Sequence, residues 1–186
     1  KVDESIIPFL QTASERQSQL PQSILQTLEL KVNYIKDLSW SKQQVLSQPR
    51  IPSIPDGVWS DVLAGRFVDL DKIYAGIVTT DAHLKQTFRF GKFEVSTPGD
   101  AQPPSKHIME HGQWITAWKR YSSAVEFAYP HRRHELSEYG DYISGMFTNA
   151  GSDNAGKVIT YDKAIRSEVA NRNELLLTDT NRFQDL

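Results

Sequence analysis

A single proline, Pro130, divides the most strongly patterned stretch of this chain into two amphipathic segments. Before it, apolar side chains recur every three or four residues from Trp114 to Ala128, and after it they recur in the same way from Leu136 to Met146. Both spacings place the apolar side chains on one face of an α-helix. Because proline lacks a backbone N–H and clashes with the preceding turn, Pro130 either kinks one long helix or begins a second. We therefore expect a helical hairpin at 107–147.

Further segments have helical spacing and indicate an all-α multi-helix bundle built around this hairpin. A weak helix is expected at 9–18. Stronger ones are expected at 21–38, at 58–65 closed by Gly65, at 70–76 closed by Gly76, and at 157–172. Residues 86–96 alternate phenylalanine and valine with polar residues around Gly91, a pattern that indicates either a small β-hairpin or an extended lid. An isolated two-stranded ribbon is only marginally stable unless it packs on helices.

The sequence also predicts how the chain is divided. Residues 47–57, SQPRIPSIPDG, contain three prolines and a glycine, which is typical of a linker. We expect an N-terminal helical arm at 1–46, a proline-rich linker at 47–57 and a main helical domain at 58–186. The arm has an apolar face with two interpretations: it packs on the chain's own core, or it packs on a second copy of the chain. The residues of that face are Leu25, Leu28, Val32 and Ile35.

Composition excludes several classes of function. The chain of 186 residues has 21 basic and 23 acidic side chains and a net charge of -2, so charge alone gives no reason to expect binding to nucleic acid or to an anionic membrane. The absence of cysteine excludes disulfides, thiolate metal sites and a cysteine nucleophile. No apolar run approaches the roughly 20 residues that span a bilayer, so no membrane association is expected. No basic-then-apolar leader follows Lys1, so no signal peptide is visible in this sequence, and a start at Lys rather than Met indicates an excerpt from a longer protein.

The only basic cluster is His131, Arg132, Arg133 and His134, directly after Pro130. Positive charge at the start of a helix opposes the helix dipole, so these side chains require compensation. One interpretation is pairing with nearby carboxylates, for which Glu126, Glu135 and Glu138 are placed. The other is contact with a phosphate or with an acidic partner surface.

Other candidate sites have more ordinary explanations. His107 and His111 are four residues apart, as helical metal ligands can be, but no third ligand follows and the zinc-protease pattern is absent, so we expect capping or partly buried histidines and no metal. Trp114 and Trp118 could stack on bases, but their place on the apolar stripe favours core packing. Asp69 and Asp71 are expected to cap a helix. With no nucleotide-binding or nucleophile motif in view, we expect neither a cofactor nor enzymatic activity.

Three blocks together carry a resemblance to a known class of proteins. They are WSDVLAGRFVDLDKIYAG at 59–76, HGQWITAWKRYSSAVEFAYPHRRHELSEYGDYISGMF at 111–147 and KVITYDKAIRSEVANRNELLLTD at 157–179. This part of the chain resembles a helical, Gag-like domain of eukaryotic tyrosine-recombinase retroelements of the DIRS-like and Crypton-related kind. The paired tryptophans of WITAW, the YPHR turn and the DKAIR helix carry the match.

The resemblance implies a non-enzymatic structural protein that associates with itself and coats the nucleic acid of the element. We therefore expect a homo-oligomer that forms through the arm. We also expect it to be located inside the cell, in the cytoplasm or nucleus. An alternative is a helical nucleic-acid-binding module that serves a recombinase or a reverse transcriptase, with Arg132 and Arg133 on phosphate. Related proteins often continue into a cysteine- and histidine-rich knuckle, which this cysteine-free chain does not contain.

Overall fold

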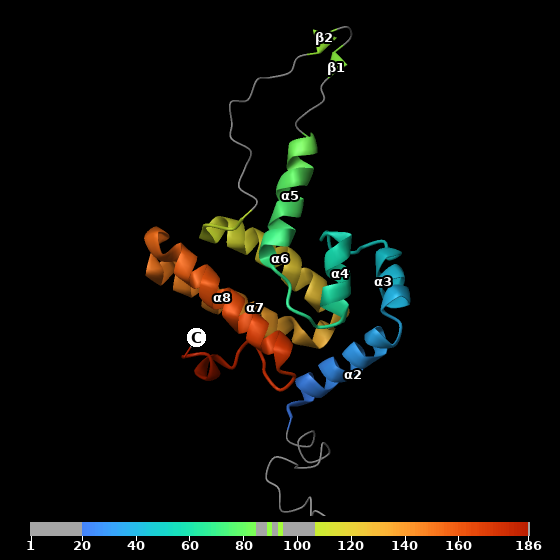
Figure 1. Cartoon of the computed structure of the whole chain (residues 1–186), viewed down its shortest axis with the longest axis vertical. Coiled ribbons are helices and arrows are strands. Elements are labelled where there is room, and N and C mark those ends of the chain that lie inside the picture. Colours follow the sequence, from blue (N-terminus) through green and yellow to red (C-terminus); the bar gives the residue numbers. More distant parts are fainter. Residues whose placement is uncertain (1–19, 85–88, 91–92, 95–106, 186) are drawn as a thin grey trace, which may run out of the picture.

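The computed structural model describes residues 20–84, 89–90, 93–94 and 107–185, and it is an all-α multi-helix bundle (Figure 1). The expected helix at 9–18 lies outside the described residues. The elements in chain order are α2 (Gln22–Lys36), α3 (Leu38–Leu46), α4 (Asp56–Leu63), α5 (Leu70–Leu84), β1 (Arg89–Phe90), β2 (Phe93–Glu94), α6 (His111–Ala128), the 3-10 turn η3 (Pro130–Arg132), α7 (Arg133–Ala150), η4 (Ser152–Asn154), α8 (Ala155–Asn171) and η5 (Thr180–Arg182).

The predicted hairpin is present as α6 and α7, joined at Pro130. Pro130 begins the short turn η3, and α7 starts at Arg133, so the proline separates two helices. The first helix begins at His111, four residues later than 107, with Glu110 at its N-cap position. α6 packs against α4, α5 and α7, which makes it the central helix of the bundle. Its tryptophans, Trp114 and Trp118, are 0% and 5% exposed, so the core interpretation of both is confirmed.

Two glycines that were both predicted to end helices behave differently. Gly65 has φ +61, a left-handed conformation that glycine adopts without strain, and it follows the end of α4. Gly76 was wrongly predicted to end a helix, because α5 continues to Leu84. A Cβ at Gly76 would lie 2.9 Å from Cγ of Pro55, so this glycine lets α5 pass close to the segment before α4. Asp69 precedes α5 and accepts a hydrogen bond from the Asp71 N–H, as expected of a capping residue.

The small β-hairpin is present as β1 and β2. The two strands are antiparallel, with Arg89 opposite Glu94 and Phe90 opposite Phe93. The backbone pairing therefore falls inside the predicted range 86–96. The expected loop at 98–105, and Ser105 as a helix cap, lie outside the described residues.

The described part of the predicted arm, residues 20–46, contains two helices where the sequence pattern indicated the single helix 21–38. Asp37 interrupts the helix, and its side chain accepts a hydrogen bond from the Trp40 N–H at 2.9 Å, which starts α3. α2 lies against the bundle: the Tyr34 hydroxyl donates to the Ala128 carbonyl at 2.8 Å, and Ile24 is 3% exposed. The predicted linker extended two residues too far, because Asp56 and Gly57 belong to α4.

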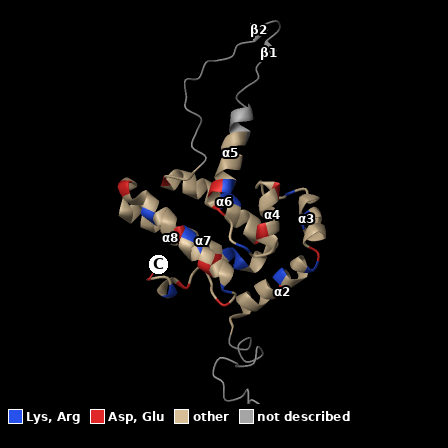
Figure 2. Cartoon of the chain, viewed as in Figure 1, with Lys and Arg blue, Asp and Glu red and all other residues tan. Residues whose placement is uncertain are grey.

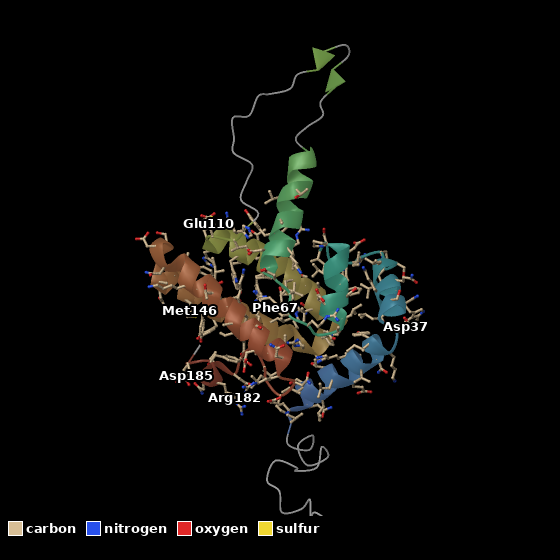
Figure 3. All side chains as sticks on the ribbon, in the orientation of Figure 1. Asp37, Phe67, Glu110, Met146, Arg182 and Asp185 are labelled. Carbon is tan, nitrogen blue, oxygen red and sulfur yellow. The ribbon has the colours of Figure 1, made fainter. Side chains whose placement is uncertain are left out.

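A buried polar cluster joins α7, α8 and the loop before α5. The Arg166 guanidinium holds both carboxylate oxygens of Asp162, at 2.8 to 3.1 Å, and donates to the Val68 carbonyl at 2.6 Å. The Tyr139 hydroxyl donates to Asp162 at 2.9 Å. The Phe67 ring faces the guanidinium at 5.2 Å, and Figure 3 labels Phe67 in the middle of the bundle. Fully buried charges of this kind are stable only when paired and hydrogen-bonded, as they are here.

Candidate functional site

Three of the four residues of the basic cluster at 131–134 lie beside the carboxylates that the sequence placed near them. Arg132 makes two parallel hydrogen bonds of 2.8 Å to Glu135. Arg133 lies 3.3 Å from a Glu126 oxygen, and the Nδ1 atom of His134 lies 3.4 Å from Glu138. All three acidic residues of the pairing interpretation are therefore occupied in this way.

Arg132 also contributes to the interior of the bundle. Its side chain is 15% exposed and that of Glu135 only 8%. A Glu135 oxygen accepts a further hydrogen bond, of 2.9 Å, from the Leu177 N–H, which fastens the C-terminal segment to the start of α7. Burial would lower the pKa of Arg132, but the bonds to Glu135 and its charge raise it. A contact with phosphate would have to compete with this bidentate pair.

His131 holds the arm to the hairpin. Its Nε2 atom lies 2.7 Å from the hydroxyl of Thr27 in α2. Burial, followed by the charge of Arg132, lowers the pKa of His131. The neutral form is therefore favoured, and this residue contributes little positive charge to the surface. The exposed members of the cluster are Arg133 and His134, whose side chains are 80% and 85% exposed.

The charges of the described surface are mixed in sign. Figure 2 shows acidic and basic residues interspersed along the helices of the bundle. Together with the net charge of -2, this distribution does not form the basic stripe that usually accompanies nucleic-acid binding. A contact of these four clustered residues with nucleic acid or with a partner protein therefore stays a prediction.

The two histidines considered as metal ligands have separate environments. The Nδ1 atom of His107 lies 3.3 Å from Asp71, whereas His111 stacks on the Phe147 ring with centroids 4.8 Å apart. Among the described residues, no group of three or more histidines, aspartates or glutamates is arranged to hold a metal ion. Trp114 and Trp118 stack on each other at 5.5 Å inside the core, where no base can reach them.

Asp71 is the centre of a network that ties three segments together. It accepts hydrogen bonds from the Ile108 N–H at 2.9 Å and from Lys163 of α8 at 3.0 Å, in addition to its contact with His107. Burial would raise the pKa of the Asp71 carboxyl, but the Ile108 N–H, Lys163 and His107 outweigh it, so the pKa is lowered. Its charged form is therefore stabilised by folding.

Replacing Asp71 with asparagine is expected to reduce the free energy of unfolding at pH 7 by about 1–3 kcal/mol, because hydrogen bonds to a charged group are lost. A lowered folded-state pKa contributes stability above the ordinary value near 4, which is lost as the pH falls. The difference between wild type and Asp71→Asn should therefore shrink below about pH 4. Urea unfolding from pH 7 to pH 3 measures it. The control Asp141→Asn, on the exposed side of α7, should change little; an equal effect would contradict the assignment.

The apolar face predicted for self-association is half-buried at one end and exposed at the other. Leu25 and Leu28 are half-buried, whereas Val32 and Ile35 are 57% and 49% exposed. The inward face of α2 is offset from the predicted one and includes Ile24 and Tyr34. Two large apolar side chains that the sequence did not single out are also exposed: Trp40 at 59% and Leu46 at 37%, both on α3. We refer to Val32, Ile35, Trp40 and Leu46 as the α2–α3 apolar set.

The tryptophan of this set could have been found from the sequence. Trp40 lies five residues before Val45, the first of the last apolar pair of the arm, and outside the stripe that includes Val32. A tryptophan that fits no inward stripe is a signal of an exposed contact. Recognising α3 as a separate helix requires Asp37 to be read as a cap, which the apolar pattern does not show.

Comparison with known proteins finds no protein-family model, no curated protein and no solved structure that matches this chain. Within the described ranges, none of the helices has the length and apolar character needed to cross a bilayer.

Proposed function

We propose that this chain is a non-enzymatic structural domain that associates with itself, of the Gag-like kind that its sequence resembles. The second copy of the chain contacts the α2–α3 apolar set. The observation that carries the proposal is the exposure of four large apolar side chains on two consecutive helices. On the same proposal, the domain works inside the cell, in the cytoplasm or nucleus.

Physical chemistry supports a protein partner for these side chains. Burying apolar surface contributes about 25 cal/mol per Å². Burying an exposed tryptophan against a partner would therefore stabilise the complex substantially. Aromatic residues are enriched at interfaces and often dominate their energetics. Since α2 already packs on the bundle through Ile24 and Tyr34, Val32 and Ile35 are available for another contact.

The position of the set favours a contact between copies. Figure 3 labels Asp37, the junction of α2 and α3, at the periphery of the bundle and away from the C-terminal segment that contains Asp185. A surface at the edge of the molecule can face the same surface of a second copy. Such a two-fold contact is the commonest arrangement in homo-oligomers.

The alternative function, a nucleic-acid-binding module, has less support. Arg132 is buried against Glu135, and the exposed Arg133 lies beside Glu126. Each exposed basic side chain of the cluster thus has a carboxylate near it, which reduces the attraction to phosphate.

Introducing charge into the apolar set is expected to dissociate the oligomer. The double variant Val32→Glu/Trp40→Glu should sediment as a monomer at concentrations where the wild type forms oligomers, because charged groups cannot be buried at the contact without a partner. Analytical ultracentrifugation over a hundredfold range of concentration measures this, with circular dichroism to verify folding.

The matched control is Gln26→Glu/Gln43→Glu. It adds the same charge to exposed positions of α2 and α3 without removing an apolar side chain. It should associate like the wild type. A wild type that remains monomeric throughout, or a control that dissociates equally, would refute the proposed contact.

A further inference from the structure

A cavity of about 70 Å³ lies where α2 and α4 meet α6, α8 and the segment after α8. Every described charged residue in its wall is basic. Figure 2 shows basic residues on α2 and α8, two of the elements that converge there. The charged wall residues are Lys31, Arg66, Arg132, Arg166 and Arg172.

Four of these five cations have carboxylate partners. Arg66 pairs with Asp61, Arg132 with Glu135, Arg166 with Asp162 and Arg172 with Glu168. None of these four acids is part of the described wall of the cavity. The charged side chains that line the cavity are therefore all basic, although four of them are neutralised by carboxylates outside the lining.

Lys31 differs from the four arginines. Its ammonium donates to the neutral amide oxygen of Asn173 at 3.1 Å, and no described carboxylate lies within ion-pairing distance. Its aliphatic stem runs against Gly65, where a Cβ would lie 3.2 Å from Cδ of the lysine. Lys31 is partly buried, and this burial lowers its pKa, as expected of a cation with no described carboxylate beside it.

Further hydrogen-bond donors border the same cavity. Within the described region, Arg66 and Arg172 contact their carboxylates through Nε, and no hydrogen bond is made by their terminal nitrogens. Both side chains are 57% exposed, as expected of residues at the mouth. The Tyr121 hydroxyl, also in the wall, makes no hydrogen bond to another described residue. An arginine has five N–H donors in a fixed fork that matches oxyanions.

We propose that this cavity binds a small inorganic oxyanion of the size of phosphate, with Lys31 as the central cation. The volume is enough for a few water molecules or one such ion, and well below the roughly 300 Å³ of typical organic-ligand pockets. The ion supplies the counter-charge that Lys31 lacks, and it links α2 to α4 and to the segment after α8. The proposal depends on no residue of the α2–α3 apolar set, so it can fail or succeed independently of the proposed self-association.

Titration with inorganic phosphate at constant ionic strength tests the proposal. In two-dimensional NMR of the full chain, the amide signals of Lys31, Gly65 and Asn173 are expected to shift saturably. The variant Lys31→Met should weaken this binding at least tenfold. The matched control Lys36→Met, at the exposed end of the same helix, should leave the affinity unchanged.

A thermal measurement extends the test to the stability of the fold. Because a ligand that binds only the folded state stabilises it, phosphate should raise the Tm of the wild type more than that of Lys31→Met. If Lys31→Met does not fold, Arg172→Gln at the mouth serves in its place and should also weaken binding. Shifts that do not saturate, or equal affinities in wild type and the lysine or arginine variant, would show a cavity that holds only water and would overturn the proposal.

Discussion

Replacing Asp162 with alanine is expected to reduce the free energy of unfolding by about 3–5 kcal/mol, because the variant leaves Arg166 buried without its counter-ion. The side chains of this pair are 1% and 3% exposed, so water cannot replace the lost carboxylate without disrupting the core. The Tyr139 hydroxyl would lose its 2.9 Å bond to the carboxylate and keep only the longer one, of 3.5 Å, to the backbone carbonyl of residue 162. For a domain whose total stability is on the order of 5–15 kcal/mol, this loss is large enough to bring it close to unfolding at 37 °C.

The control for this variant lies on the same helix. Glu168 and Arg172 form an ion pair with the same four-residue spacing, but their side chains are 32% and 57% exposed. Glu168→Ala should cost less than about 1 kcal/mol, as is usual for exposed pairs. Urea unfolding of both variants provides the comparison, and similar losses in the two would contradict the role assigned to Asp162.

A double replacement separates the charge from the packing. Asp162→Leu/Arg166→Met removes both charges and keeps apolar volume, so it should be less destabilising than the sum of the two single changes. Some loss should remain because the Val68 carbonyl would lack its partner and the Tyr139 hydroxyl would keep only the backbone carbonyl of residue 162, at 3.5 Å. Additive effects would mean that the two residues do not act as a pair.

The elements that the sequence predicted well are those encoded by local spacing. The stripe from Trp114 to Ala128 and the proline after it are sufficient to indicate α6, the turn and α7. The pairing of Arg132 with Glu135, three residues apart, also follows from helical spacing. Information of this kind is contained within a few turns of one helix.

The features that the sequence did not reveal depend on contacts between distant segments. The inward face of α2 is fixed by Tyr34, which bonds to Ala128, and by Thr27, which bonds to His131. These partners are 94 and 104 residues away, so the apolar pattern of 21–38 alone could not identify that face. The lysine-centred cavity is assembled from several such segments and could not have been predicted for the same reason.

The contact between the two helices of the hairpin gives a second large expected effect. Gly140 of α7 faces Trp118 of α6 so closely that a Cβ would lie 2.6 Å from Nε1 of the indole. The indole cannot move aside easily, because it stacks on Trp114 and also contacts the rings of Tyr121 and Tyr139. Glycine at 140 is therefore required by close packing of the helices rather than by backbone conformation.

Gly140→Ala is expected to lower the free energy of unfolding by about 1–3 kcal/mol through overpacking, although alanine favours a helix by about 1 kcal/mol over glycine. Gly145→Ala, one and a half turns later on α7, is the matched control. It is exposed and a Cβ there would meet nothing within 4 Å, so it should raise the stability by up to about 1 kcal/mol. Thermal and urea unfolding should therefore shift in opposite directions for the two variants. If both alanines were stabilising, the α6–α7 contact would have to be looser than the structure shows, and the tryptophan pair would not be the fixed centre of the bundle.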